Sequence, residues 1–357
     1  MAYTNIDDPS AYFQTATYSG TGSSGNAITN DGNSDLQPDF VWIKVRTYNN
    51  EHMLQDSSRG FAGSGEVNVL KSNTTSAEGT NGAFASFDTN GFEVGGTNAA
   101  SRAYNGSSDT YAAWQWKANG GTTSSNTDGS KTATVQANTD AGFSIVTYAG
   151  SGSASTVGHG LADTPDVIIF KNRSAANVWA TYHQGLGNNY KLELNSTNAQ
   201  DSDGSFMNGT LPTSSVFTVG ASVNTNGSGS NYVAYCFAEK QGYSKFGKYV
   251  GNGNSNGPFV YTGFRPAFVM LKRTNGTGGW TIYDNKRGYN GNNYELFPNS
   301  SEAEYTGTSF FEADILSNGF KLRLTNSQIN GSGDTYIYMA FAENPFTTST
   351  GVPCTAR

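Results

Sequence analysis

The chain has 357 residues, of which 13% are aromatic and only 14% are charged, with 44 glycines and a formal net charge of −7. Its aromatic content excludes an intrinsically disordered chain, because disordered sequences lack the large apolar side chains that form a core. The acidic balance and the absence of a basic run argue against nucleic acid as a partner, since phosphate backbones are bound by clustered Lys and Arg.

The N-terminal stretch MAYTNIDDPS has neither the basic start nor the apolar centre of a signal peptide. No apolar run in the chain approaches the roughly 18 residues that a membrane helix requires. We therefore expect synthesis in a cytoplasm and no membrane insertion, and any extracellular role must be reached without the usual export signal.

Three segments of the chain repeat one order of motifs, which is the pattern of tandem structural units. Each segment begins with an aromatic strand and a glycine-rich turn, at 12–22, 142–152 and 244–253. A proline-led apolar strand follows, namely QPDFVWIKVR (37–46), TPDVIIFKNR (164–173) and RPAFVMLKR (265–273). The closing strands align without gaps, so that the following positions correspond: Tyr111, Tyr232 and Tyr336, and Trp116, Phe237 and Phe341.

Within each segment the apolar runs are short and are separated by Asn, Gly and Ser. Asn-Gly pairs, which supply the positive φ angles of tight turns, occur at Asn90-Gly91, Asn105-Gly106, Asn275-Gly276 and Asn318-Gly319. No stretch has a helical period. The sequence therefore predicts an all-β protein of three tandem repeated β-sandwich units.

We place the first unit at 1–118, the second at 142–239 and the third at 240–344, followed by a C-terminal tail at 345–357. A unit of roughly 100 residues is large enough to hold its own core. The segment 119–141 is rich in Gly, Ser and Thr and is predicted to be a linker, either extended and mobile or draped along a neighbour.

The repeated apolar strand ends each time on a lysine: Lys44, Lys171 and Lys272. We expect these ammonium groups to emerge into water at the strand end or to pair with a local acid such as Asp56 or Asp284. The alternative is a bound ligand anion. The third copy has Ala267 in place of the Asp and Thr274 in place of the second basic residue, so any site that used those groups would be lost there.

The sequence shows no arrangement typical of catalysis, and we predict no catalytic residues, no cofactor and no metal site. His52, His159 and His183 occupy different positions of the repeat, whereas zinc sites need several ligands at one place. Two carboxylates across a cleft, which a glycan depolymerase would need, stay an open alternative. Cys236 is expected in the core, and a disulfide to Cys354 is left undecided.

The loops that combine Tyr with Asn are the best candidates for ligand binding. Tyrosine offers a flat stacking face and asparagine offers adaptable hydrogen bonds, as in antibody paratopes. The alternative is ordinary turn chemistry with an occasional exposed tyrosine. The candidate residues are Tyr48, Asn49, Asn50, Tyr104, Asn105, Tyr289, Asn293 and Tyr294.

Several blocks carry a family resemblance, among them PDFVWIKVR (38–46), DSSRG (56–60), LKSNTTSAE (70–78) and DTYAAWQWKA (109–118). Together they resemble a family of virion proteins of tailed, often marine, bacteriophages in which this β-unit is often repeated. We expect a protein that is not an enzyme, and for its position in the virion we favour the phage tail over the capsid surface. The resemblance implies a structural or tail-fibre-like protein with lectin-like or jelly-roll-like sandwich domains. It implies no catalytic residue.

The expected role is that of a tail fibre or receptor-binding component. Its expected partners are other tail proteins and a bacterial cell-surface glycan or receptor. Because such assemblies usually have cyclic symmetry, a homo-oligomer is expected, with a trimer favoured; three internal units that mimic a trimer within one chain are the other possibility. The alternative roles are a capsid-decorating, head-fibre or tail-connector protein without a receptor, and a glycan depolymerase. The repeated strand is expected in the core. In the receptor-binding role, recognition should therefore lie in the loops that differ between copies.

Overall fold

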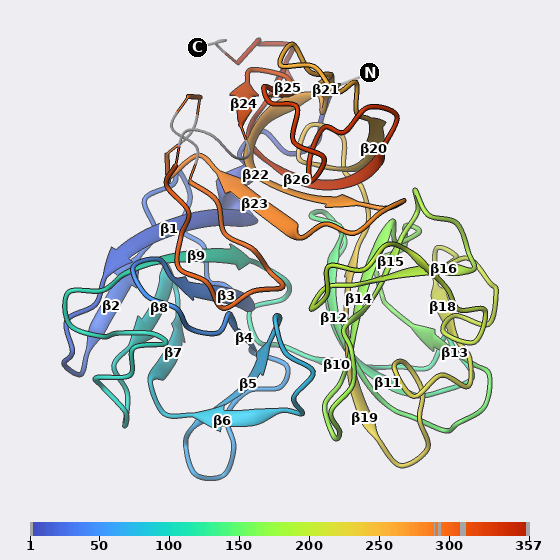
Figure 1. The fold of residues 1–357 in the computed structure, drawn as a ribbon. Coiled ribbons are helices and arrows are strands. Elements are labelled where there is room, and N and C mark those ends of the chain that lie inside the picture. Colours follow the sequence, from blue (N-terminus) through green and yellow to red (C-terminus); the bar gives the residue numbers. More distant parts are fainter. Residues whose placement is uncertain (1–2, 289, 292–293, 308–311, 355–357) are drawn as a thin grey trace.

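The computed structural model describes residues 3–288, 290–291, 294–307 and 312–354, and within them it is almost entirely β (Figure 1). The prediction of an all-β fold is confirmed, and the strands pair in antiparallel sheets. A single turn of 3₁₀ helix, Pro9–Ala11, precedes the first strand. Within the described residues no helix is long and apolar enough to cross a membrane.

Three large sheets share one order of corresponding strands: β1-β9-β3-β4, β12-β19-β14-β15 and β20-β26-β22-β23. We call the parts of the chain that contain them unit 1 (β1–β9), unit 2 (β10–β19) and unit 3 (β20–β26). The first sheet contains β1 (Phe13–Ser19), β9 (Thr110–Trp116), β3 (Phe40–Val45), β4 (Met53–Asp56), β5 (Val67–Lys71) and β6 (Gly79–Asn81).

The second large sheet contains β10 (Ser124–Asn126), β11 (Ala133–Asn138), β12 (Phe143–Ala149), β19 (Asn231–Phe237), β14 (Val167–Asn172), β15 (Ala180–His183), β16 (Tyr190–Glu193) and β17 (Asp201–Ser202). The third contains β20 (Ser244–Val250), β26 (Thr335–Pro345), β22 (Phe264–Arg273) and β23 (Trp280–Asp284). The segment predicted as a linker is therefore partly sheet, because β10 and β11 pair with each other and β11 pairs with β12.

Each large sheet carries a small sheet on its outer face, which completes a sandwich. The small sheets are β2 (Asn26–Thr29), β8 (Gly91–Val94) and β7 (Phe84–Asp88); β13 (Ser155–Gly158) and β18 (Val216–Val219); and β21 (Phe259–Tyr261), β25 (Gly319–Leu322) and β24 (Ala313–Leu316). In unit 1, for example, Val41 and Ile43 of β3 share a core with Phe84 and Phe92 of the small sheet.

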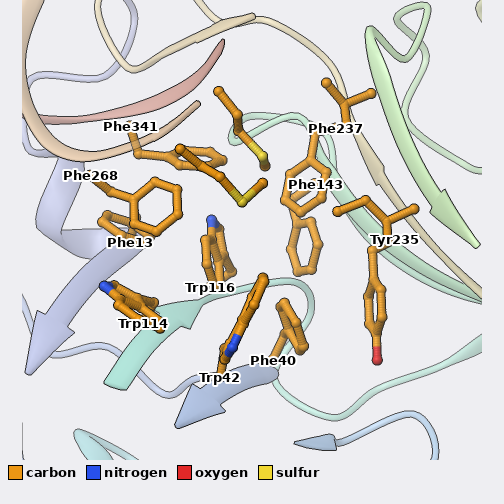
Figure 2. Packing of buried hydrophobic residues seen from close by; sticks show 14 of the residues in the cluster. Phe13, Phe40, Trp42, Trp114, Trp116, Phe143, Tyr235, Phe237, Phe268 and Phe341 are labelled. Carbon is orange, nitrogen blue, oxygen red and sulfur yellow. The ribbon is translucent and has the colours of Figure 1, made fainter. Parts of the chain in front are cut away.

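The inner faces of the three large sheets meet in one shared core, which the prediction of three separate cores did not include (Figure 2). The closing aromatic residues form its centre. The ring centroid of Phe341 lies 5.6 Å from that of Trp116 and 5.9 Å from that of Phe237, and the last two lie 6.3 Å apart. Because these positions correspond in the three units, the units surround a pseudo-threefold axis. Strand β3 is buried along its whole length because it has a core on each face.

The Asn-Gly turns behave differently from the prediction. Of the four glycines, Gly91 has a positive φ of 112°, whereas Gly106, Gly276 and Gly319 do not. Gly319 is required for a different reason, since a Cβ there would lie 2.1 Å from the carbonyl oxygen of Val260. A glycine in such a motif can therefore serve a close backbone approach instead of a left-handed turn.

Candidate functional site

The three repeated lysines are buried, so the expectation that their ammonium groups reach water is wrong. Lys171 Nζ donates to the carbonyl oxygens of Thr75 (2.8 Å) and Asn177 (2.5 Å). Lys44 Nζ and Lys272 Nζ each donate to the carbonyl oxygen of the next residue, at 2.7 Å. Burial lowers the pKa of all three lysines to about 8. These ammonium groups are therefore occupied by backbone carbonyls.

The lysines are buried because each strand end is covered by a segment of a neighbouring unit. Three corresponding segments do this: 71–78 of unit 1, 193–200 of unit 2 and 297–304 of unit 3. Their last residues donate equivalent backbone hydrogen bonds: Glu78 to Arg173 (2.9 Å), Gln200 to Thr274 (2.8 Å) and Glu304 to Arg46 (2.8 Å). The contacts run from unit 1 to 2, from 2 to 3 and from 3 back to 1, so the chain closes into a ring. We call these contacts seams 1–2, 2–3 and 3–1.

Seam 1–2 contains a buried charged network. The guanidinium of Arg59 lies 2.5 Å from Asp56 Oδ2 and 2.9 Å from Glu78 Oε2, and the side chains of Asp56 and Arg59 are fully buried. The hydroxyl of Tyr235, from unit 2, donates to Asp56 Oδ2 at 2.7 Å. Glu78 also binds Arg173 across the seam at 2.7 Å. Asp56 is therefore the partner of an arginine and not of Lys44.

Seam 3–1 repeats this network. Arg287 lies 2.6 Å from Asp284 Oδ2 and 3.0 Å from Glu304 Oε1. Trp114 Nε1, from unit 1, donates to Asp284 Oδ2 at 3.0 Å, where seam 1–2 has Tyr235. Arg46 completes the network with Glu304 at 2.8 Å. The acids and bases of the repeated DSSRG and DNKRG motifs therefore join units and do not form a catalytic cleft.

The histidines also lie in structural positions. In seam 2–3 His183 replaces the aspartate, and its Nε2 lies 3.1 Å from the carbonyl oxygen of Tyr338. Burial lowers the pKa of His183 to about 4, so the ring is neutral at pH 7. His52 Nδ1 accepts a hydrogen bond from Trp42 Nε1. Among the described residues there is no group of three or more His, Cys, Asp or Glu that could hold a metal, and Cys236 and Cys354 are both free.

Two predicted loop residues, Tyr104 and Asn105, are fully buried and cannot meet a ligand. The hydroxyl of Tyr104 donates to Gln55 Oε1 at 3.0 Å. The side chain of Asn105 ties its loop to another, accepting from the backbone of Thr21 and donating to the carbonyls of Ser23 and Ala99. Corresponding side chains make the same contacts in the other units, which marks them as scaffold: Asn226 and Asn330.

Asn49 and Asn50 are also committed to structure, at seam 3–1. Asn49 Oδ1 accepts a hydrogen bond from Ala303 N, and Asn50 N donates to the carbonyl oxygen of Ser301, both at 2.8 Å. Predicted residues Tyr289 and Asn293 lie outside the described residues. Of the predicted ligand-binding set, Tyr48 and Tyr294 therefore stay as surface candidates.

The structure brings Tyr48 and Tyr294 to the same seam. Tyr48 is 43% exposed, and the guanidinium carbon of Arg102 lies 3.6 Å from the centroid of its ring. Arg102 is held by Asp109 at 2.8 Å. The guanidinium of Arg46, two residues before Tyr48, lies 6.0 Å from the Tyr294 ring. A guanidinium over a tyrosine face is attracted to the negative face of the ring.

The Tyr48–Arg102 pair has no counterpart in the other units. The positions that correspond to Tyr48 hold Ala175 and Gly276. Arg102 corresponds to Val223 and Ser327, because the carbonyl oxygens of all three accept from the hydroxyls of the matching tyrosines Tyr111, Tyr232 and Tyr336. Arg102 was missing from the predicted site residues. The sequence signal that identifies it is its difference from Val223 and Ser327 at an otherwise repeated position.

A family model described as a domain of unknown function (DUF7483) matches residues 8–345 of the chain. No curated protein matches the chain, and no solved structure matches it.

Proposed function

The chain belongs to the DUF7483 family, and we propose that it is a non-enzymatic structural protein of a tailed-phage virion, placed on the tail, that presents unit-specific loops to a bacterial surface. One observation carries this proposal: the side chains that recur in all three units are buried, whereas the exposed Tyr48–Arg102 pair occurs once. A repeated scaffold whose surface residues differ from unit to unit is suited to a protein that presents its surface loops to a partner.

The charged residues support a display role in a second way. Arg59, Asp56, Arg287 and Asp284 have no exposed side-chain surface, so they hold units together and do not face solvent. A capsid-decorating role is the second candidate, because a single chain with pseudo-threefold symmetry fits a threefold position of a shell. In the tail role, the expected homotrimer would add a second level of threefold symmetry to the one within the chain.

The position on the particle tests this proposal. Gold-labelled antibody against the protein should mark the distal tail in electron micrographs of particles of the phage that encodes this chain. Label on the capsid would replace the tail role with the decorating role. Label on neither would refute the proposal of a virion protein.

The role of Tyr48 is tested by adsorption of the purified, fluorescently labelled protein to host cells. We expect Tyr48→Ala to reduce adsorption about tenfold, which corresponds to the roughly 1.4 kcal/mol lost with one stacking contact. Tyr190→Ala is the matched control, because Tyr190 is a tyrosine of similar exposure (38%) on unit 2. Equal adsorption by the wild type and both variants would contradict a role for Tyr48 in binding host cells.

A further inference from the structure

A cavity of about 400 Å³ lies at one end of the shared core, and its lining includes Tyr3, Asn5, Tyr12, Asp140, Lys240 and Gln241. The lining residues show that the cavity is axial. The carbonyl oxygens of Tyr12, Gly142 and Tyr243 accept equivalent hydrogen bonds in units 1, 2 and 3. Asp140 and Gln241 each lie two residues before such a position, so all three units contribute their entry segment to this one cavity. Its volume is within the range of about 300–1,000 Å³ typical of small-molecule sites.

The N-terminal arm makes the cavity unique in the ring. Ile6 belongs to the shared core, and Thr4 is buried beside it. The hydroxyl of Tyr3 donates to the carbonyl oxygen of Gly263 in unit 3 at 2.6 Å. The arm therefore runs from unit 1 to unit 3 and forms one side of the cavity. The N-terminal arm thus forms one wall of the axial pocket, and it makes the three sides of the pocket different.

The lining combines two aromatic rings with polar groups of a particular kind. Tyr12 is held in place by an edge contact with the buried Tyr243, at 5.9 Å between centroids. Asp140 and Gln241 are exposed and supply a carboxylate and an amide. Lys240 is paired with Asp163 at 2.6 Å, so its charge is already balanced. Flat aromatic faces beside amide and carboxylate groups suit the apolar face and the hydroxyls of a sugar, and the negative charge of Asp140 disfavours an anion.

An aromatic track continues from the pocket onto unit 3. The ring of Tyr3 lies 6.4 Å from that of Phe346, and its hydroxyl lies 3.4 Å from the hydroxyl of Tyr261. Tyr261 is 52% exposed and Phe346 is 38% exposed. The strand registers place Thr29 and Gly158 at the positions that correspond to Tyr261, so this exposed ring is specific to unit 3.

We propose that the axial pocket binds a neutral sugar residue of a bacterial surface glycan, and that the glycan continues over Tyr3, Tyr261 and Phe346. Tyr12 and Tyr3 stack on the sugar, while Asp140 and Gln241 accept and donate hydrogen bonds with its hydroxyls. The inference rests on the proposed function for the source of the glycan. The sugar site itself can be measured on the purified chain.

The test uses a printed panel of glucose, galactose, N-acetylglucosamine, N-acetylgalactosamine and rhamnose with their short oligomers, and sialylated and sulfated oligosaccharides as the acidic set. We expect binding to a neutral member, which is then titrated by calorimetry. Asp140→Ala should weaken it about tenfold or more, because the variant removes a charged hydrogen-bond acceptor from the pocket. Asp35→Ala, which removes an exposed aspartate outside the pocket, should leave the affinity unchanged.

Tyr261→Ala should weaken the oligomer and leave the single sugar unaffected, because Tyr261 lies beyond the pocket. Both Asp140 and Tyr261 are exposed, so these variants should fold normally. The site is overturned if no neutral sugar binds at millimolar concentration, if the acidic set alone binds, or if neither variant alters affinity. A positive panel with gold label absent from particles refutes the virion role alone, and a negative panel with Tyr48-dependent adsorption refutes the sugar site alone.

Discussion

Seams 1–2 and 2–3 have equivalent backbone contacts, but the corresponding side chains are charged in seam 1–2 and neutral in seam 2–3. Seam 1–2 buries Asp56, Arg59 and Glu78, and these charges balance when Arg173 is included. The corresponding positions of seam 2–3 hold neutral groups, namely His183, Leu186, Gln200 and Thr274. The polar contact across the seam changes as well, because Met339 stands where unit 2 has Tyr235.

The difference shows that these positions vary as a set. A buried arginine without its acid, or an acid without its arginine, would leave an unpaired charge in the interior. Seams 1–2 and 3–1 keep all of the charges, whereas seam 2–3 keeps none at the corresponding positions. The ring closes with charged residues at two seams and with neutral residues at the third, so its closure depends on backbone contacts and apolar packing. The charges determine how much stability is lost when one member of a charged network is replaced.

The largest expected effect comes from removing one charge from the network. Arg59→Met leaves the fully buried Asp56 without its cation and should lower the free energy of unfolding by about 3–5 kcal/mol. Urea denaturation followed by tryptophan fluorescence measures this change. Leu186→Met, at the corresponding position of seam 2–3, is the control and should cost less than about 1.5 kcal/mol. Equal losses for both variants would contradict the difference between the seams.

Replacing residues of seam 1–2 by those of seam 2–3 should lower the free energy of unfolding by less than the sum of the losses in the single variants. The triple variant Asp56→His, Arg59→Leu and Tyr235→Met replaces a charged set with the neutral one that the chain already uses. We expect its loss of unfolding free energy to fall short of the sum of the single losses by about 0.5–3 kcal/mol. The same denaturation series provides the four values. Strict additivity would show that these positions do not act together.

A smaller effect is expected at the edge of the seam. The Arg173 side chain is 23% exposed, so Arg173→Thr should cost about 1 kcal/mol. Adding Glu78→Gln restores the charge balance, with Arg59 still paired to Asp56, and reproduces the Thr274 and Gln200 of seam 2–3. The double variant should be no less stable than Arg173→Thr. A further loss of stability would indicate that Glu78 matters for a reason other than charge balance.

The smallest effect concerns pH. Burial raises the pKa of Glu78, but the hydrogen bond from Arg173 and the charges of Arg59 and Arg173 outweigh it and hold the pKa below its ordinary value. A depressed carboxyl pKa stabilises the fold above the unfolded pKa of about 4.3, and this contribution disappears as pH falls through the folded value. The stability difference between wild type and Glu78→Gln should therefore shrink from pH 7 toward pH 3. A constant difference would mean that Glu78 contributes no charge-dependent stability.

The all-β fold followed from local features of the sequence, chiefly short apolar runs separated by turn residues. The shared core did not, because the inner face of β3 is apolar whether it faces its own sandwich or a neighbouring unit. The ammonium group of Lys44 was predicted to reach water, because a lysine that follows an apolar run usually does so at the end of its strand. Its burial depends on residues 297–304, far away in the sequence.

The candidate site was predictable in part. Tyr48 is exposed and stays a predicted ligand-binding residue, whereas Tyr104 and Asn105 are buried. The prediction failed for these two residues because a buried Tyr-Asn pair has the same composition as an adaptable loop. The recurrence of Asn105 as Asn226 and Asn330 was a usable sign of scaffold. The axial pocket had no local signature, since Tyr3, Tyr12 and Asp140 meet only when the ring closes.

The central claim is that three sandwiches share one core and form a single closed ring. Differential scanning calorimetry of the whole chain tests it most directly. We predict one unfolding transition whose calorimetric and van't Hoff enthalpies agree, as expected for one cooperative unit. Two or three separate transitions, whose enthalpies together account for the three units, would show that the units unfold independently and would contradict the account.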